Sequence, residues 1–149
     1  MIFLLFIQNL FFSEATINFK SSKEPTYIEA ESLTLNQKDK KFIYQGKVKV
    51  TQGEMTITTD NLEGIYNDNN EIQTLNALKN VVIIKGEELR ATGDKAVYDA
   101  KTEIVTLTGN PEVTEGDSQL LADVIKLFIA EDRSEAEGNV RMKLVKKEQ

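Results

Sequence analysis

A short motif recurs four times along the chain, and this repetition constrains the fold more than any other feature of the sequence. Each copy places Gly or Asn before alternating apolar residues, and successive copies are 34, 29 and 29 residues apart. The copies begin at Gly46, Asn80, Gly109 and Gly138. Units of this length stack side by side, because one unit alone cannot bury its apolar face.

A second marker precedes each copy, and it consists of a small residue and a polar or Gly position that lead into an apolar strand. The four second markers are Ala30-Glu31-Ser32-Leu33, Thr59-Asp60-Asn61-Leu62, Thr92-Gly93-Asp94-Lys95 and Ala122-Asp123-Val124-Ile125. Polar turn clusters separate the two markers at residues 36–40, 67–70, 99–102 and 131–134. Each repeat is therefore predicted to be a strand, a turn and a second strand.

Alternation of apolar and polar residues indicates strands rather than helices in these repeats. Val48 and Val50 alternate with lysines, and the segments 55–59 and 140–144 follow the same period of two. Residues 119–130 and 94–100 could also be read as helical, but their places in the repeat favour strands. A short helix in residues 119–130 stays an alternative.

The sequence thus predicts an all-β domain, an antiparallel meander of about four strand-turn-strand repeats with about eight to ten short strands. We expect the meander to curl into a jelly-roll-like, V-shaped pair of sheets whose apolar faces look at each other. A parallel β-solenoid is the alternative fold, but the hairpin-like turns favour antiparallel pairing. The apolar interior is an ordinary core in one interpretation and a place for lipid chains in the other.

The N-terminal segment is typical of an export signal. An apolar run over residues 2–12 precedes the first charged residue, Glu14, and is too short for the roughly 20 residues of a membrane-spanning helix. Small residues at Ser13 and Ala15 suit signal peptidase. We predict a cleaved signal peptide over residues 1–15; an uncleaved anchor and a buried N-terminal helix are the alternatives, because no Lys or Arg precedes the run.

The rest of the chain divides by composition. Residues 16–26 are expected to form a flexible segment, residues 27–145 the β domain and residues 146–149 a C-terminal tail. The chain has no Cys, so no disulfide is expected to stabilise the domain. Its net charge of −6 argues against duplex nucleic acid as a partner.

The chain lacks the side chains on which most enzyme chemistry depends. Without His or Cys there is no imidazole base, no Ser-His or Cys-His pair and no ordinary zinc site. Carboxylates remain, and the candidates are Glu87-Glu88, Glu131-Asp132 and the group Glu112, Glu115 and Asp117. Neighbours in a strand point to opposite faces, so the adjacent pairs suit solvated turns better than acid and base catalysis.

Two further polar features are better explained as turns. Residues 67–71 cluster oxygen ligands but lack the Gly and the distant Glu of an EF-hand loop. The glycines do not assemble a phosphate-binding loop. The sequence predicts no enzyme, no catalytic residue, no metal site and no cofactor.

Three segments carry a resemblance to a known family. Residues 27–33, 42–53 and 57–62 match in order an acidic strand start, a Phe-x-x-x-Gly-x-Val-x-Val-x-Gln-Gly hairpin and an Ile-x-Ala-Asp-x-Leu strand. This pattern resembles the OstA-like family of lipopolysaccharide transport, and the likeness continues through residues 96–98 and 104–111. The chain differs at Thr59, where the family usually has Ala, and at Lys47, where it often has Asn.

The resemblance implies a β-jelly-roll with an apolar groove that carries lipopolysaccharide through the periplasm. It also implies an inner-membrane transport complex with an LptC-like component and an LptD-like outer-membrane translocon as partners. Subunits would join head to tail by strand addition, since a chain of antiparallel strands leaves unpaired edges at both ends. The candidate groove residues are Val48, Val50, Met55, Ile57, Val82, Ile84, Val105, Leu107, Ile125, Leu127 and Ile129.

Two alternative functions stay open at this point. One is an OstA-type module of the same system that is anchored in the inner membrane, similar to LptC. The other is a secreted enzyme that acts on polysaccharide through paired carboxylates such as Glu87 or Glu131.

Overall fold

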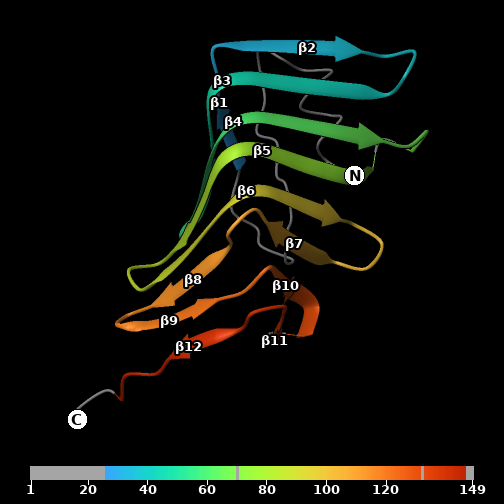
Figure 1. Ribbon diagram of the computed structural model, residues 1–149. Coiled ribbons are helices and arrows are strands. Elements are labelled where there is room, and N and C mark those ends of the chain that lie inside the picture. The colour runs from blue at the N-terminus through green and yellow to red at the C-terminus, as the bar shows by residue number, and fades with distance from the viewer. Residues whose placement is uncertain (1–25, 70, 132, 147–149) are drawn as a thin grey trace.

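The computed structural model describes residues 26–69, 71–131 and 133–146, and these residues form strands joined by short turns (Figure 1). The predicted signal peptide and almost all of the predicted flexible segment lie outside them. The strands are β1 (Thr26–Glu29), β2 (Ser32–Asn36), β3 (Lys41–Gln52), β4 (Met55–Tyr66), β5 (Ile72–Lys85), β6 (Leu89–Asp99), β7 (Ile104–Thr108), β8 (Glu112–Glu115), β9 (Ser118–Leu121), β10 (Val124–Phe128), β11 (Arg133–Glu137) and β12 (Arg141–Lys143). One turn of 3-10 helix, η1 (Ile129–Glu131), follows β10. The all-β prediction is confirmed.

All strands belong to one antiparallel sheet, which excludes the parallel solenoid. Its order is β1-β3-β4-β5-β6-β7-β10-β11, and it branches at both ends. At one end β1 and β2 both pair with β3, and towards the other end β7 and β8 both pair with β6. The second branch continues through β9 to β12.

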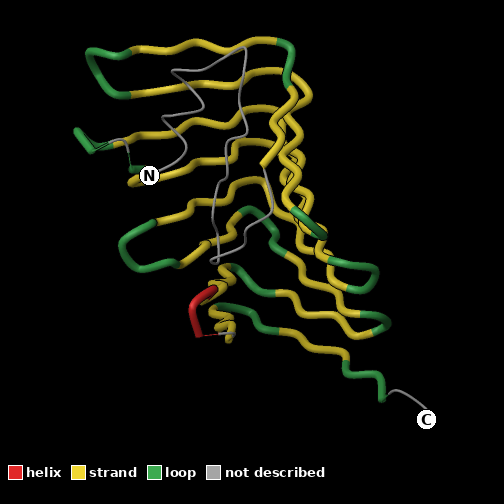
Figure 2. The backbone as a smooth tube through the Cα atoms, turned by 180° about the vertical axis from the view of Figure 1, so that it is seen from behind, coloured by secondary structure: helices red, strands yellow, loops and turns green. Residues whose placement is uncertain are grey.

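The sheet branches because the long strands are bent in the middle. Figure 2 shows these strands changing direction between their two halves. The register shifts after Gln45 in β3, after Thr58 in β4 and after Leu78 in β5. The bends divide the sheet into two layers. The first layer comprises β2, β7, β10, β11 and those halves of β3 to β6 that lie on the same side of the bends as these strands. The second layer comprises β1, β8, β9, β12 and the other halves.

The predicted V-shaped pair of sheets is formed by one continuous bent sheet, and its central strands are longer than the short strands that the sequence indicated. β3, β4, β5 and β6 are 12, 12, 14 and 11 residues long, and each runs through both layers. One bent sheet therefore supplies both walls of the V.

Each bend contains two consecutive residues with left-handed backbone. The pairs are Gly46-Lys47 (φ 82° and 46°), Lys79-Asn80 (φ 68° and 52°), Gly109-Asn110 (φ 75° and 52°) and Gly138-Asn139 (φ 77° and 47°). Gly and Asn tolerate this conformation better than other residues. The recurring Gly or Asn motif of the sequence is thus the bend itself, stacked four times along the sheet.

The second marker lies opposite each bend. The amide of Glu31 donates to the carbonyls of Gln45 and Gly46, and the amide of Asp123 donates to Glu137 and Gly138. Asp94 donates in the same way to Gly109. These hydrogen bonds close the gap that the extra bend residues leave in the ladder.

Side-chain contacts also tie the acidic residues to the bends. Asn80 Nδ2 donates to Asp60 Oδ2 over 2.9 Å, and Asn139 Nδ2 donates to Asp123 Oδ2 over 2.9 Å. The hydroxyl of Thr59 lies 3.0 Å from the carbonyl oxygens of both Leu78 and Lys79. The two markers therefore form one repeated corner.

Most of the predicted turns are where the sequence placed them, and the 119–130 segment is β rather than helical. β9 and β10 occupy most of it, and the short helix is limited to η1. The last turn lies earlier than predicted, because Arg133 and Ser134 already belong to β11. Asp132 lies outside the described residues.

Candidate functional site

The inner face of the second layer carries a row of apolar side chains that crosses every strand of the layer. Register places the members directly opposite one another from strand to strand. In order, the second-layer row is Ile28, Val50, Ile57, Ile83, Ala91, Val113, Leu120 and Met142. Such direct neighbours lie about 4.5–5.5 Å apart, so the row is a continuous apolar strip.

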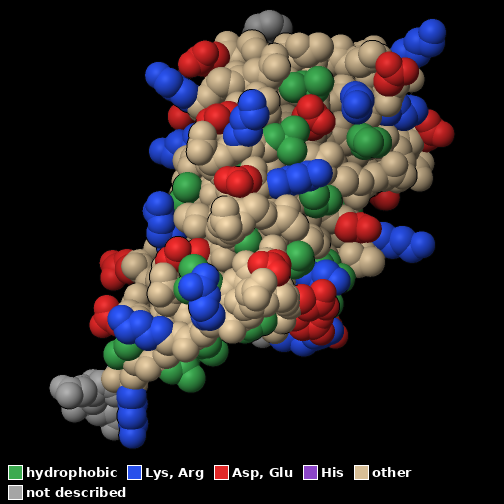
Figure 3. All heavy atoms as spheres, viewed as in Figure 1, with side chains coloured by type: hydrophobic (Ala, Val, Ile, Leu, Met, Phe, Trp, Pro, Cys, Tyr) green, Lys and Arg blue, Asp and Glu red, His purple; other side chains and the backbone are tan. Residues whose placement is uncertain are grey.

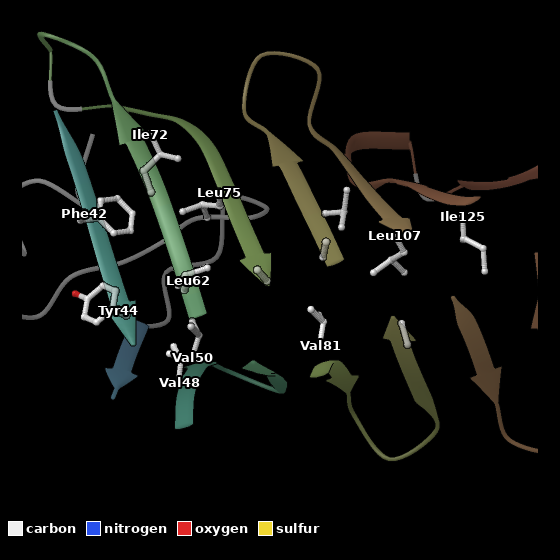
Figure 4. Close-up of a cluster of buried hydrophobic side chains, with 14 of the residues drawn as sticks. Phe42, Tyr44, Val48, Val50, Leu62, Ile72, Leu75, Val81, Leu107 and Ile125 are labelled. Carbon is white, nitrogen blue, oxygen red and sulfur yellow. The ribbon is translucent and has the colours of Figure 1, made fainter. Parts of the chain in front are cut away.

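The inner face of the first layer carries a matching strip. The first-layer row is Leu33, Tyr44, Leu62, Ala77, Ala96, Leu107, Ile125 and Ala136. Phe42 and Leu75 occupy the next row of this face, and Figure 4 shows the labelled side chains projecting between the ribbons. The two strips face each other, and all of their members except Met142 belong to one apolar cluster.

Nine of the eleven predicted groove residues belong to this interior. Val48, Val50, Val105, Leu107 and Ile125 are buried. Met55 and Ile57 lie on the inner face of β4 and are half-buried. Leu127 in β10 and Ile129 in η1 pack against the buried cluster.

Val82 and Ile84 are not brought together with the others. They point to the outer face of the second layer, and Ile84 is 36% exposed. Their neighbours Val81 and Ile83 point inwards instead. The sequence motif aligned Asn80 with Gly46, whereas the bend aligns Lys79 with Gly46, and a slip of one residue moves every side chain to the other face.

A narrow pocket of about 50 Å³ separates the layers near the middle of the sheet. Val50, Ile57 and Ile83 line it from the second layer. The first layer contributes Leu62, Leu75, Ala77, Ala96, Tyr98 and Val105. This volume is small compared with the roughly 300–1,000 Å³ of typical small-molecule sites. A long hydrocarbon chain would therefore enter only if the layers moved apart.

A wider groove of about 820 Å³ lies at the C-terminal end of the second layer. Val113, Leu120 and Met142 line it together with polar residues such as Glu115 and Ser118. Met142 is 61% exposed. The apolar strip thus reaches solvent at the end formed by β12.

One polar group stands out in the apolar interior. The side chain of Tyr44 is only 4% exposed, and its hydroxyl has no hydrogen-bond partner among the described residues. Burial raises the pKa of this phenol far above its usual value, so it stays neutral. A buried hydroxyl without a partner costs about 1–3 kcal/mol. The sequence offered no signal of this, because a tyrosine in a strand is ordinary.

A second interior tyrosine, Tyr98, also has a shifted pKa, and it is half-buried beside the pocket. Desolvation by burial is the main reason that its pKa is raised, and the negative charges of Glu103 and Asp99 raise it further. No buried charge lies on either apolar row.

Charged contacts gather at the turns and on the edge of the sheet. Lys40 Nζ lies 2.8 Å from Asp68 Oδ1, and the hydrogen bond raises the pKa of Lys40 and lowers that of Asp68. Arg133 stacks 3.7 Å from the ring of Phe128 and pairs with Glu131 and Glu135. Figure 3 shows Lys, Arg, Asp and Glu side chains spread over the visible face of the molecule and along its margins.

Of the candidate catalytic carboxylates, Glu88, Glu115 and Asp117 line the wide groove near β12, and none of the described candidates is buried. Glu87, Glu88 and Glu131 are exposed, and Glu112 accepts a hydrogen bond from Gln119 Nε2 over 2.8 Å. Within residues 26–69, 71–131 and 133–146, no group of three or more Asp, Glu, His or Cys residues could hold a metal ion. The same residues include no helix long and apolar enough to cross a membrane.

Comparison with known proteins gives a sequence family, a relative and a fold. Residues 27–133 match the family described as LptA/(LptD N-terminal domain) LPS transport protein. The Uncharacterized protein R00383 of Rhizobium meliloti (strain 1021) is 25% identical over 138 residues, which cover 83% of this chain and 73% of that protein.

Among solved structures, the chain is similar to LptH, the LptA homologous periplasmic component of the conserved lipopolysaccharide transport device from Pseudomonas aeruginosa. The TM-score is 0.73 at 17% identity, and the match covers 83% of this chain and 97% of that one. At this identity the likeness concerns the fold: a bent antiparallel sheet with an apolar interior.

Proposed function

Because the chain belongs to the family of LptA and the LptD N-terminal domain, which are LPS transport proteins, we propose that it carries lipopolysaccharide through the periplasm between its two layers. The predicted resemblance to the OstA-like family is confirmed by this match over residues 27–133. The observation that carries the proposal is the apolar interior, whose two strips cross the sheet from one edge to the other. Acyl chains would lie along these strips while the sugars stay in water.

Energetics limits how the cargo is held. Fully burying an acyl chain of a dozen carbons is worth on the order of 9 kcal/mol at ~0.8 kcal/mol per methylene. Several chains held completely would scarcely leave, so a carrier must shield them only in part. The wider groove near β12, where the apolar strip reaches solvent, suits such partial shielding, whereas the pocket of about 50 Å³ would accept an acyl chain only if the layers moved apart.

The free edges support a role as one unit of a bridge. Among the described residues, β1 and β2 each pair on one side only, and so do β11 and β12 at the other end. Val140, Met142 and Leu144 add exposed apolar side chains beside β12. Strand addition would join copies of this chain head to tail and would place an LptC-like inner-membrane partner and an LptD-like outer-membrane partner at opposite ends.

Export would depend on the predicted signal peptide over residues 1–15. Sequencing the N-terminus of the mature protein from envelope fractions tests this part. A mature chain that begins after Ala15 is expected. Retention of residues 1–15 in the inner membrane would favour the anchored, LptC-like module instead.

Site-specific photo-crosslinking tests the transport proposal directly. A photoreactive residue at Ile83, Leu107 or Leu127 should capture lipopolysaccharide in cells, because these side chains belong to the interior. Ile84 is the matched control, since it is the same residue type on the same strand but faces outwards. Capture at Ile84 equal to that at Ile83, or no capture at any interior position in a folded protein, would sink the proposal.

A further inference from the structure

The Tyr44 hydroxyl is a buried donor without a hydrogen-bond partner among the described residues. In the first-layer row its direct neighbours across the strands are Leu33 and Leu62, whose side chains have no acceptor atom. The ring packs edge-on against Phe42, with centroids 5.9 Å apart and an interplanar angle of 69°. A phenylalanine would keep this ring contact, so the hydroxyl adds nothing to the packing of the described residues.

The position of Tyr44 suggests what the hydroxyl could meet. β3 is separated from the N-terminal edge of the first layer by β2 alone. In Figure 4 the oxygen of Tyr44 points away from Leu62 and its strand β4. A molecule that lies along the two apolar strips would therefore pass this donor near one end of the interior.

Hydrocarbon cannot satisfy a hydroxyl, so the chemistry of the missing partner is restricted. In an acylated glycolipid, acceptor oxygens next to the apolar chains occur where the chains are joined, as ester or amide carbonyls. A neutral phenol donates well to such a carbonyl, and a hydrogen bond made in an apolar surrounding is strong.

We propose that Tyr44 is a binding residue whose hydroxyl donates a hydrogen bond to the carbonyl oxygen of an acyl linkage in the bound lipid. This inference rests on the proposed function, because it needs a lipid between the layers. It assigns the linkage region to the N-terminal end of the interior and the hydrocarbon to the strips beyond β4. The residue then selects acylated cargo rather than hydrocarbon of any kind.

The test compares Tyr44→Phe with wild-type protein on a matched pair of lipids. The probes are dioctanoyl phosphatidylglycerol, which has ester carbonyls, and its dioctyl ether analogue, which has none; purified lipopolysaccharide is titrated in parallel. Tyr44→Phe should weaken binding of the ester lipid and of lipopolysaccharide by about five- to tenfold, as expected for one hydrogen bond. Binding of the ether lipid should stay within about twofold.

Tyr27→Phe is the control, because it removes the same hydroxyl from an exposed side chain on β1. It should change none of the three affinities. The thermal midpoint of Tyr44→Phe without lipid should equal or exceed that of wild type, since a buried unpaired hydroxyl is removed. A lower midpoint would mean that the hydroxyl is structural, which overturns the inference.

The outcomes separate this inference from the function on which it rests. Equal losses for the ester and ether lipids, or no loss for either, would overturn the role of Tyr44 while wild-type binding of lipopolysaccharide still supports transport. Failure of wild-type protein to bind lipopolysaccharide would refute the proposed function, and the Tyr44 inference with it.

Discussion

Gly64 is expected to be the least replaceable glycine among the described residues, for a steric reason. It pairs directly with Phe42 across β3 and β4. A Cβ added at Gly64 would overlap the Cζ, Cε1 and Cε2 atoms of the Phe42 ring. Phe42 is fully buried, with 0% exposure, so the ring has nowhere to move. The Phe42 ring therefore packs directly on the backbone of Gly64, in the space that any larger residue would need for its Cβ.

The magnitude follows from overpacking and cavity terms. Forcing an extra methyl into a packed core costs typically ~1–3 kcal/mol, and the direct overlap places Gly64→Ala at about 3 kcal/mol. Phe42→Ala should cost about 4 kcal/mol from lost burial and the cavity left behind. The double variant should cost about 4 rather than about 7 kcal/mol, because the clash disappears with the ring.

Urea unfolding followed by circular dichroism measures these free energies. Gly116→Ala is the control, because nothing lies within 4 Å of a Cβ added there and only its φ of 58° opposes the change. It should cost about 1–2 kcal/mol, as for a non-glycine residue in left-handed backbone. A free energy of unfolding of Gly64→Ala within about 0.5 kcal/mol of the wild-type value, or additive losses for the Gly64 and Phe42 variants, would contradict the steric clash.

Three further outcomes are expected. Thr59→Val should lower the free energy of unfolding by about 1 kcal/mol, because its hydroxyl hydrogen-bonds at the bend carbonyls of Leu78 and Lys79; urea unfolding of Thr59→Ser, which keeps the hydroxyl, should show no such loss. Tyr44 has a raised pKa in the folded state, so the unfolded chain releases this proton first and stability should fall as pH rises above about 10. Unfolding at several pH values should show a shallower fall for Tyr44→Phe, and identical slopes would contradict the burial of a neutral phenol. Met142→Asp places a charge on the exposed apolar side chain of β12 and should reduce self-association about tenfold by light scattering; Thr102→Asp, in a turn away from the edges, should leave it unchanged.

The sequence was sufficient for the class of fold because the signals involved are local. Alternation such as Val48 and Val50 between lysines places side chains on opposite faces of a strand, whatever surrounds it. Turn residues between the markers fix hairpins in the same local way. The repeats therefore predicted an antiparallel V before any tertiary contact was considered.

Register within a repeat could not be read so reliably. The bend of the second repeat begins at Lys79, a residue that nothing in the sequence marks as left-handed, and its φ is 68°. Aligning Asn80 with Gly46 shifted the repeat by one residue and placed Val82 and Ile84 in the interior instead of Val81 and Ile83. Because side chains alternate between the two faces of a strand, an error of one residue in register assigns every side chain to the opposite face.

Local patterns along the chain were enough to predict an all-β fold of four stacked repeats, and the composition shows that the chain has no His and no Cys. The three-dimensional fold was needed to show that one bent sheet forms both walls and which residues face the interior. It was also needed to show that the Tyr44 hydroxyl is buried there without a partner among the described residues. The reason is physical: strand and turn preferences depend on neighbours along the chain, whereas burial and hydrogen bonding depend on residues that folding brings together from distant repeats.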